Sequence, residues 1–296
     1  MQELNEGRAD AALQHLDAVL AGNPGDARAL NLRCRVYYEE EQWDRAISDC
    51  EAAVRADGGN SDYHLWLGRA YGQKASRVSL MKAYTLARKV GAEFQRAVQM
   101  DPRNVQALEA LGEFDVGAPA LVGGGLARAQ NVAQQLQGVD AGAALTLEAR
   151  IAESRHDYAT AENDYKAAIA RSKNPAAAWM TLAGFYGRRG RYDQMEAAAR
   201  RGASIDPGNG PALVDGANAL ARARRDPQTA IQWLREYLQS HQLSEDAPAF
   251  AVHVRLAALL QNQGDAAGAQ QQLAEAHALA SGYRIPMSIA SATAGR

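Results

Sequence analysis

Amphipathic helical periodicity runs through most of the chain. In residues 27–38 the side chains that recur every three or four positions include Leu30, Cys34 and Tyr37, and a second run from Ala46 to Val54 repeats the pattern. Residues three and four apart share one face of an α-helix, so each run predicts a helix with one packing face. The two runs are separated by the stretch EEQWD and therefore predict an antiparallel pair of helices.

Short phrases rich in proline and glycine divide the helices at regular intervals. NPGD, DGGN, DPRN and DPGN begin at residues 23, 57, 101 and 206, so they are 34, 44 and 105 residues apart, and 105 is close to three periods of 34. Proline cannot continue a helix and glycine favours its end, so each phrase predicts a helix stop. One helical pair cannot bury its apolar face alone, and the regular spacing predicts a stack of helical hairpins.

Aromatic and small residues recur at fixed places within these hairpins. In residues 176–209 they are Trp179, Leu182, Ala183, Tyr186, Gly190, Tyr192 and Pro207, with Met195 where alanine would be usual; Leu67, Gly68 and Tyr71 match in an earlier unit. This pattern resembles the tetratricopeptide repeat (TPR), a helix–turn–helix of 34 residues, over nearly the whole sequence. The resemblance implies an all-α fold, a right-handed α-α superhelix of about seven helical hairpins plus an N-terminal half repeat. The insertions are similar to those of uncharacterised bacterial TPR proteins.

The resemblance divides the protein into a TPR solenoid over residues 1–282 and a flexible tail over residues 283–296. The expected units are a partial one at 1–26, then 27–60, 61–104, 105–142, 143–175, 176–209, 210–246 and 247–282. The partial unit lacks most of a first helix. We therefore expect an exposed apolar edge there, covered by a missing segment, a partner or a second copy of the protein.

Three consecutive glycines stand in LVGGGLARA, residues 121–129, where a phosphate-binding loop is one interpretation. A Walker-type loop needs Lys followed by Ser or Thr after its last glycine and a strand before it. Here Leu126, Ala127 and Arg128 follow, and the preceding pattern is helical. We expect the glycines to widen the turn within a hairpin; a partner-contacting loop and an anion site at the helix start are the alternatives.

Composition and charge exclude several classes of protein. The net charge is −2 and the basic residues are dispersed, so the basic footprint of a nucleic-acid-binding protein is missing. No apolar stretch approaches the roughly 20 residues that span a bilayer. The start MQELNEGRAD does not resemble a signal peptide. We expect a soluble protein, cytoplasmic or, if a leader has been removed, periplasmic.

The candidate reactive side chains form no recognisable catalytic or metal-binding motif. Cys34 and Cys50 have no His or Cys at zinc-finger spacing, and the six histidines show no metalloprotease arrangement. We therefore expect no catalytic residue, no metal and no cofactor. We expect the two cysteines to be buried free thiols, since a disulfide between them would require an oxidising compartment. The four tryptophans, Trp66 among them, are expected to pack in the core.

The resemblance implies a concave wall built from the first helix of each hairpin. The side chains that it places on this wall are Arg28, Asn31, Arg35, Tyr38, Leu65, Arg69, Gln73, Glu109, Glu113 and Arg150. Its arginines would hold an acidic or C-terminal segment of a partner through charge-assisted hydrogen bonds, unless they are only solvated helix faces. Some TPR proteins clamp the terminal carboxylate of a chaperone with a set of Lys and Asn residues. Here Asn31 and Arg35 occupy places where that set has Lys and Asn, so this protein lacks the chaperone clamp.

Together these features predict a non-catalytic scaffold or adaptor that binds a peptide or protein partner in the concave groove. Two alternatives remain open at this point. One is a structural array that self-associates through the N-terminal half repeat, and the other is an accessory domain of an enzyme complex, which would need a polar cleft with displaced pKa values.

Overall fold

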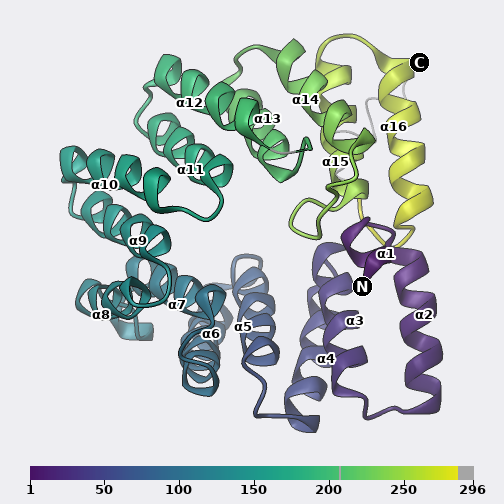
Figure 1. Ribbon diagram of the computed structural model, residues 1–296. Coiled ribbons are helices and arrows are strands. Elements are labelled where there is room, and N and C mark those ends of the chain that lie inside the picture. The colour runs from purple at the N-terminus through teal and green to yellow at the C-terminus, as the bar shows by residue number, and fades with distance from the viewer. Residues whose placement is uncertain (207, 286–296) are drawn as a thin grey trace. The chain divides into compact units, whose positions relative to one another are not determined.

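Helices make up nearly all of the regular structure. A computed structural model describes residues 1–206 and 208–285, and over these residues it contains sixteen α-helices, one 3-10 helix and no strand (Figure 1). The all-α class predicted from the periodicity is therefore confirmed. Pro207 and residues 286–296 of the expected tail lie outside the described residues.

The helices follow one another through short turns. The first ten are α1 (Gln2–Asn5), α2 (Ala9–Gly22), α3 (Ala27–Glu39), α4 (Trp43–Ala56), α5 (Ser61–Ala75), α6 (Leu80–Met100), α7 (Val105–Gly117), α8 (Leu126–Gln137), α9 (Ala141–Ser154) and α10 (Tyr158–Arg171). The remaining six are α11 (Pro175–Arg188), α12 (Tyr192–Ile205), α13 (Pro211–Ala223), α14 (Pro227–Gln239), α15 (Ala249–Asn262) and α16 (Ala266–Leu279). The 3-10 helix, η1 (Ala120–Val122), lies between α7 and α8.

The described residues form two compact units. Unit 1 contains Met1–His15, Glu39–Glu41 and the described residues from Asn174 onward, and unit 2 contains Leu16–Tyr38 and Gln42–Lys173. In unit 2, α5 packs on α6, α7 on α8 and α9 on α10; in unit 1, α11 packs on α12, α13 on α14 and α15 on α16. The first helices of successive hairpins also contact one another. These contacts join α5 to α7, α7 to α9 and α11 to α13. Each unit is thus a stack of helical hairpins.

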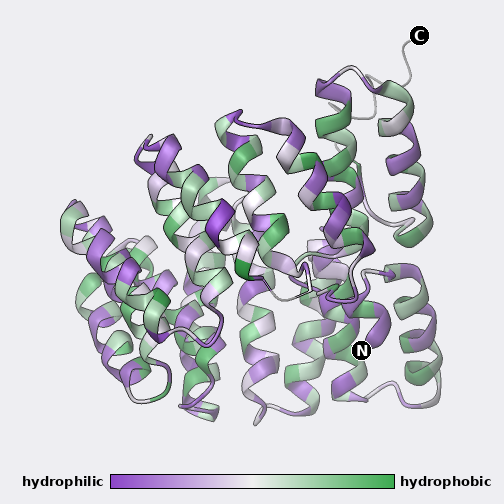
Figure 2. Ribbon diagram, turned by 45° about the horizontal axis from the view of Figure 1, so that its top comes forward, coloured by the Kyte–Doolittle hydropathy of each residue, from purple (hydrophilic) through white to green (hydrophobic). Residues whose placement is uncertain are grey.

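Small residues opposite large ones let the helices of unit 2 approach closely. A β-carbon at Gly68 of α5 would lie 2.5 Å from the ring of Phe94 on α6, and one at Gly112 of α7 would lie 2.4 Å from Leu147 on α9. Interiors are packed too densely to absorb such overlaps without rearrangement. Figure 2 shows hydrophobic residues interleaved with hydrophilic ones along the helices, as the amphipathic pattern requires.

In three of the four turn phrases the last residue caps the helix that follows. Asp26 of NPGD accepts a hydrogen bond from the Ala29 amide, and Asn104 of DPRN accepts one from the Ala107 amide. Asn60 of DGGN caps α5 in the same way. A side-chain oxygen at this position satisfies a backbone N–H that has no partner within the helix. The recurring phrases therefore stop one helix and start the next.

A disulfide bond joins the two helices of the α3–α4 hairpin. Cys34 of α3 and Cys50 of α4 are bonded, with 5.3 Å between their Cα atoms, and both are fully buried. The expectation of free thiols is wrong, whereas the expectation of burial is right. A separation of 16 residues does not tell whether two side chains face each other; only the packing of α3 on α4 brings them together.

The N-terminal segment is buried in part, and Val19 of α2 is still 47 % exposed. Leu4, Ala9 and Ala12 are buried. In unit 1 the Ser281 amide donates a hydrogen bond of 3.0 Å to Asp10 Oδ2, and a β-carbon at Gly7 would lie only 2.2 Å from the backbone nitrogen of Ala249. Residues close to α15 and α16 thus cover this N-terminal segment. Self-association through the half repeat stays a prediction.

A buried histidine ties α5 to α6 and to the turn before α5. His64 is 2 % exposed, its Nδ1 lies 2.6 Å from Glu93 Oε2 and its Nε2 lies 3.1 Å from the carbonyl oxygen of Gly58. The carbonyl oxygen and an ionised Glu93 carboxylate both accept hydrogen bonds, and only the protonated imidazole can donate from both ring nitrogens. The bond to Glu93 raises the pKa of His64, while burial and the charge of Arg96 oppose that rise.

Stability should consequently fall as the pH rises above neutrality. The folded-state pKa of His64 lies above its ordinary value of about 6.5. Its contribution is therefore complete below about pH 6.5 and is lost as the pH passes through the raised pKa. Urea denaturation between about pH 6 and pH 9 measures this slope. Glu93→Gln should flatten it; an unchanged slope in that variant would assign the pH dependence to other groups.

Candidate partner-binding surface

Two arginines stack against one tryptophan on the first helices of unit 2. The guanidinium carbon of Arg35 (α3) lies 5.0 Å from the centre of the Trp66 ring (α5), and that of Arg69 lies 4.6 Å from it. Both distances fall within the range of a cation–π interaction. Arg35 and Arg69 are 34 residues apart, one repeat length, so they occupy equivalent places in successive hairpins.

A tyrosine and a glutamine complete this cluster. The ring of Tyr38 meets Trp66 edge to face at 5.4 Å, and the Gln73 side-chain amide donates a hydrogen bond of 3.2 Å to the Tyr38 hydroxyl. We call Arg35, Tyr38, Trp66, Arg69 and Gln73 the Trp66 cluster. Four of its members were predicted for the concave wall. Trp66 was assigned to the core, and its 5 % exposure agrees with that, but its stacking with two arginines was not foreseen.

The first helices of the next two hairpins are α7 and α9. They carry acidic side chains, and two of their charged residues pair with each other. Arg150 of α9 contacts both carboxylate oxygens of Glu113 on α7 at 3.1 to 3.2 Å. These two predicted partner-binding side chains therefore satisfy one another. Glu109 is exposed, yet loss of hydration raises the pKa of its carboxyl, with repulsion from Asp140 and Glu113 acting in the same direction and Arg69 opposing. The surface thus changes from basic at Arg69 to acidic at Glu109.

Three other predicted residues lie outside this surface. Asn31 is 3 % exposed and Leu65 is 0 % exposed, so both side chains belong to the packed interior and we leave them out of the site. Arg28 is exposed at the start of α3, two helical turns before Arg35, and lies apart from the Trp66 cluster. The repeat register places these residues on a first helix, but the packing of neighbouring helices decides which of them reach solvent.

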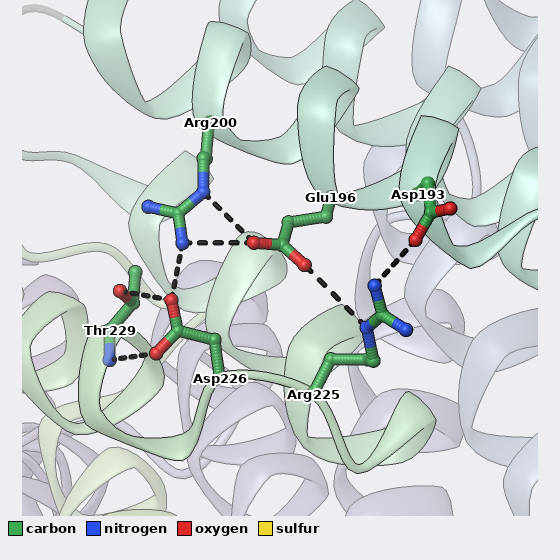
Figure 3. Close-up of polar contacts among 6 residues, drawn as sticks. All are labelled: Asp193, Glu196, Arg200, Arg225, Asp226 and Thr229. Carbon is green, nitrogen blue, oxygen red and sulfur yellow. Dashed lines mark hydrogen bonds and ion pairs between the residues drawn. The ribbon is translucent and has the colours of Figure 1, made fainter.

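A network of ion pairs in unit 1 has a structural role. Arg200 binds both Glu196 and Asp226, and Arg225 binds Asp193 and Glu196 (Figure 3). Asp226 also caps α14 by accepting from the backbone and the hydroxyl of Thr229. Its φ of +35° is an unfavourable backbone conformation for a residue with a side chain. The network thus fixes the turn between α13 and α14, and its charged groups are paired with one another.

The three glycines form a turn. Gly123 and Gly125 have φ angles of +104° and +153°, and a β-carbon at Gly124 would lie 2.0 Å from the backbone oxygen of Ala118. The Gly125 amide donates to the backbone oxygen of Asp115 at 2.8 Å. All three positions are therefore glycine for backbone reasons. The geometry agrees with the predicted widened turn between α7 and α8.

The described residues contain no cluster of three or more His, Cys, Asp or Glu side chains that could hold a metal ion. Among the same residues, no helix combines the length and the apolar composition needed to cross a bilayer.

Comparisons with known proteins identify the repeats. Two tetratricopeptide repeat family models match, one over residues 3–68 and the other over residues 146–210. These two segments of the protein are therefore tetratricopeptide repeats. No curated protein matches its sequence.

Solved TPR structures share the fold at low sequence identity. Yeast Tom70 is 14 % identical with a TM-score of 0.56, and the match covers 98 % of this protein and 59 % of that one. A thermophilic TPR protein from Thermus thermophilus is 18 % identical with a TM-score of 0.50, covering 60 % of this protein and 91 % of that one. A TPR protein from Parabacteroides merdae is 13 % identical with a TM-score of 0.50, covering 86 % and 91 %. These likenesses confirm the TPR fold.

Proposed function

We propose that this protein is a non-catalytic scaffold, and that the Trp66 cluster binds a carboxylate-bearing segment of a partner protein. The observation that carries the proposal is the pair of guanidinium groups, from Arg35 and Arg69, held against one ring. A guanidinium that stacks through its face keeps its N–H donors in its plane, where they match the two oxygens of a carboxylate. Stacking also lowers the entropy that each arginine loses on binding.

The surface beyond the cluster gives the partner segment a direction. Glu109 and the Glu113–Arg150 pair follow the basic cluster on α7 and α9. An anionic group would be attracted at Arg69 and repelled at Glu109. A segment that fits both has its carboxylate at the Trp66 cluster and a basic or hydrogen-bond-donating side chain toward Glu109. An acidic residue and the free C-terminus of a polypeptide share the required chemistry.

The test of this proposal is selection of peptides from a random library displayed with free C-termini. The protein should enrich peptides with an acidic residue or a terminal carboxylate, and the double variant Arg35→Gln, Arg69→Gln should bind them at least about tenfold more weakly, because each lost charge-assisted hydrogen bond contributes about 1.5–3 kcal/mol. Circular dichroism should show unchanged helicity.

The matched control is Arg103→Gln with Arg155→Gln, which removes the same charge from two exposed positions of unit 2 outside the cluster. It should bind the selected peptides like the unmodified protein. Equal binding by the cluster variant, or enrichment without any acidic preference, would assign partner binding to another surface.

The disulfide supports an oxidising compartment for the folded protein. Protein disulfides persist in secreted and periplasmic settings and are rare where glutathione and thioredoxin keep thiols reduced. Of the two compartments expected from the sequence, the Cys34–Cys50 bond favours the periplasmic one.

A further inference from the structure

The hairpin of α5 and α6 ends in a tip with large exposed apolar side chains. α6 has 21 residues, the greatest length among the described helices, because ten extra residues are inserted in this repeat. At its start Leu80 is 86 % exposed and Met81 is 83 % exposed, while Tyr84 is 38 % exposed. We call residues 74–89 the α5–α6 tip. Apolar side chains gathered at such exposure mark a contact surface more often than chance.

The same tip is basic. Between Asp62 and Glu93 the sequence has no acidic residue, and the tip itself carries Lys74, Arg77, Lys82, Arg88 and Lys89. Lys74 pairs with Asp44 and Lys89 lies 4.0 Å from Glu51, so carboxylates of α4 balance the two lysines nearest the body of unit 2. No carboxylate of the described residues forms an ion pair with Lys82 or Arg88. The positive charge is therefore concentrated beside the exposed apolar side chains.

The tip also contains a groove of about 590 Å³. Val78, Met81 and Leu86 supply its apolar lining, and its polar lining consists of Lys74, Lys82, Thr85 and Lys89. Leu80 does not line this groove and projects into solvent. An occupant must therefore offer anionic groups to the lysines and also cover an apolar residue that stands outside the groove.

We propose that the α5–α6 tip binds the surface of a lipid bilayer that contains anionic lipids. Leu80 and Met81 would enter the boundary between headgroups and acyl chains, and Lys82 and Arg88 would lie at the level of the lipid phosphates. A bilayer presents both chemistries over a wide surface, so it covers the projecting Leu80 and the groove together, whereas an acidic peptide in the groove would leave Leu80 in water. Binding of this kind combines buried apolar area with attraction to anionic headgroups and needs no membrane-spanning helix.

Vesicle flotation tests the proposal with the full-length protein. Unmodified protein should float with vesicles of phosphatidylcholine and phosphatidylserine and should not float with phosphatidylcholine alone. Raising NaCl from about 0.1 M to about 1 M shortens the screening length from about 10 Å to about 3 Å and should weaken binding. Each basic residue near an anionic surface contributes about fivefold in affinity, so Lys82→Glu with Arg88→Glu should lose at least about tenfold.

Two further variants separate insertion from adsorption and from a general charge effect. Leu80→Trp should be quenched by brominated lipids in anionic vesicles, and Arg103→Trp, on an exposed turn away from the tip, should not. Arg103→Glu with Arg155→Glu, which changes the net charge equally, should float like the unmodified protein. Circular dichroism checks that each variant is helical.

Three results would overturn the proposal. They are no flotation with anionic vesicles, undiminished flotation of the Lys82→Glu, Arg88→Glu variant, and flotation without quenching of Leu80→Trp. If the protein bound poly-glutamate at the tip but did not bind anionic vesicles, the tip would be reassigned to an acidic protein partner. The Trp66 cluster takes no part in any of these measurements, so their outcome is independent of the proposed function.

Discussion

Replacing Trp66 by alanine is expected to lower the free energy of unfolding by about 3 to 5 kcal/mol, the range for removal of a large buried aromatic side chain. Trp66 is 5 % exposed, belongs to the main hydrophobic cluster of unit 2 and also supports Tyr38 by an edge-to-face contact. The loss combines the transfer energy of the ring with the cavity that remains, because neighbouring helices relax only in part. Urea denaturation followed by circular dichroism measures it.

Tyr192→Ala is the matched control, since that ring is 43 % exposed at the start of α12. It should change the free energy of unfolding by about 0.5 kcal/mol or less. Trp66→Phe keeps an apolar ring in place and should stabilise the fold better than alanine does, yet it should weaken peptide binding because phenylalanine is a poorer cation–π partner. If Trp66→Ala were no more harmful than Tyr192→Ala, the ring would not be a packing centre.

Reduction of the Cys34–Cys50 bond is expected to lower the free energy of unfolding by about 3 kcal/mol, the entropic contribution for a closed loop of about 15 residues. The cross-link restricts the unfolded polypeptide, and the two sulfurs fill a fully buried position between α3 and α4. Denaturation with and without dithiothreitol gives the difference. Because Arg35 follows Cys34 directly, peptide binding at the Trp66 cluster should weaken together with stability.

The double variant Cys34→Ala, Cys50→Ala provides the control for the reductant. It should start with the lower stability and should show no further change on addition of dithiothreitol. Titration of thiols in the denatured, unreduced protein should find none. The Cys34–Cys50 bond would be contradicted if two thiols were titrated in that experiment and the denaturation midpoint of the unmodified protein did not change on addition of dithiothreitol.

The repeat length by itself predicts much of the candidate surface. Arg35 and Arg69 are one period apart, and equivalent positions in stacked hairpins lie near one another. Their convergence on Trp66 was open to discovery from the sequence, because Trp66 precedes Arg69 by three residues on the same helix. The stacking was not predicted, because a tryptophan at an interior repeat position is expected to lie in the hydrophobic core. Trp66 is buried as expected, and it also stacks with the arginines.

The 34-residue repeat period does not predict which side chains of a first helix are buried. Leu65 and Arg69 are four residues apart on α5, yet Leu65 is fully buried while Arg69 reaches the surface. Leu65 belongs to the buried cluster of unit 2, and a sequence period of 34 does not say which positions of a helix its neighbours cover. The residues next to Gly7 and Asp10 of the N-terminal segment are Ala249 and Ser281, more than 200 positions away in sequence.

The sequence by itself determined the helices, their stops and caps, and their pairing in hairpins, because these depend on side-chain periodicity and on residues adjacent in sequence. Tertiary structure alone decided the Cys34–Cys50 bond, the stacking of Arg35 and Arg69 on Trp66, and the cover over the N-terminal segment. Each of these depends on where one helix surface meets another, and that contact is selected by the fit of many side chains at once.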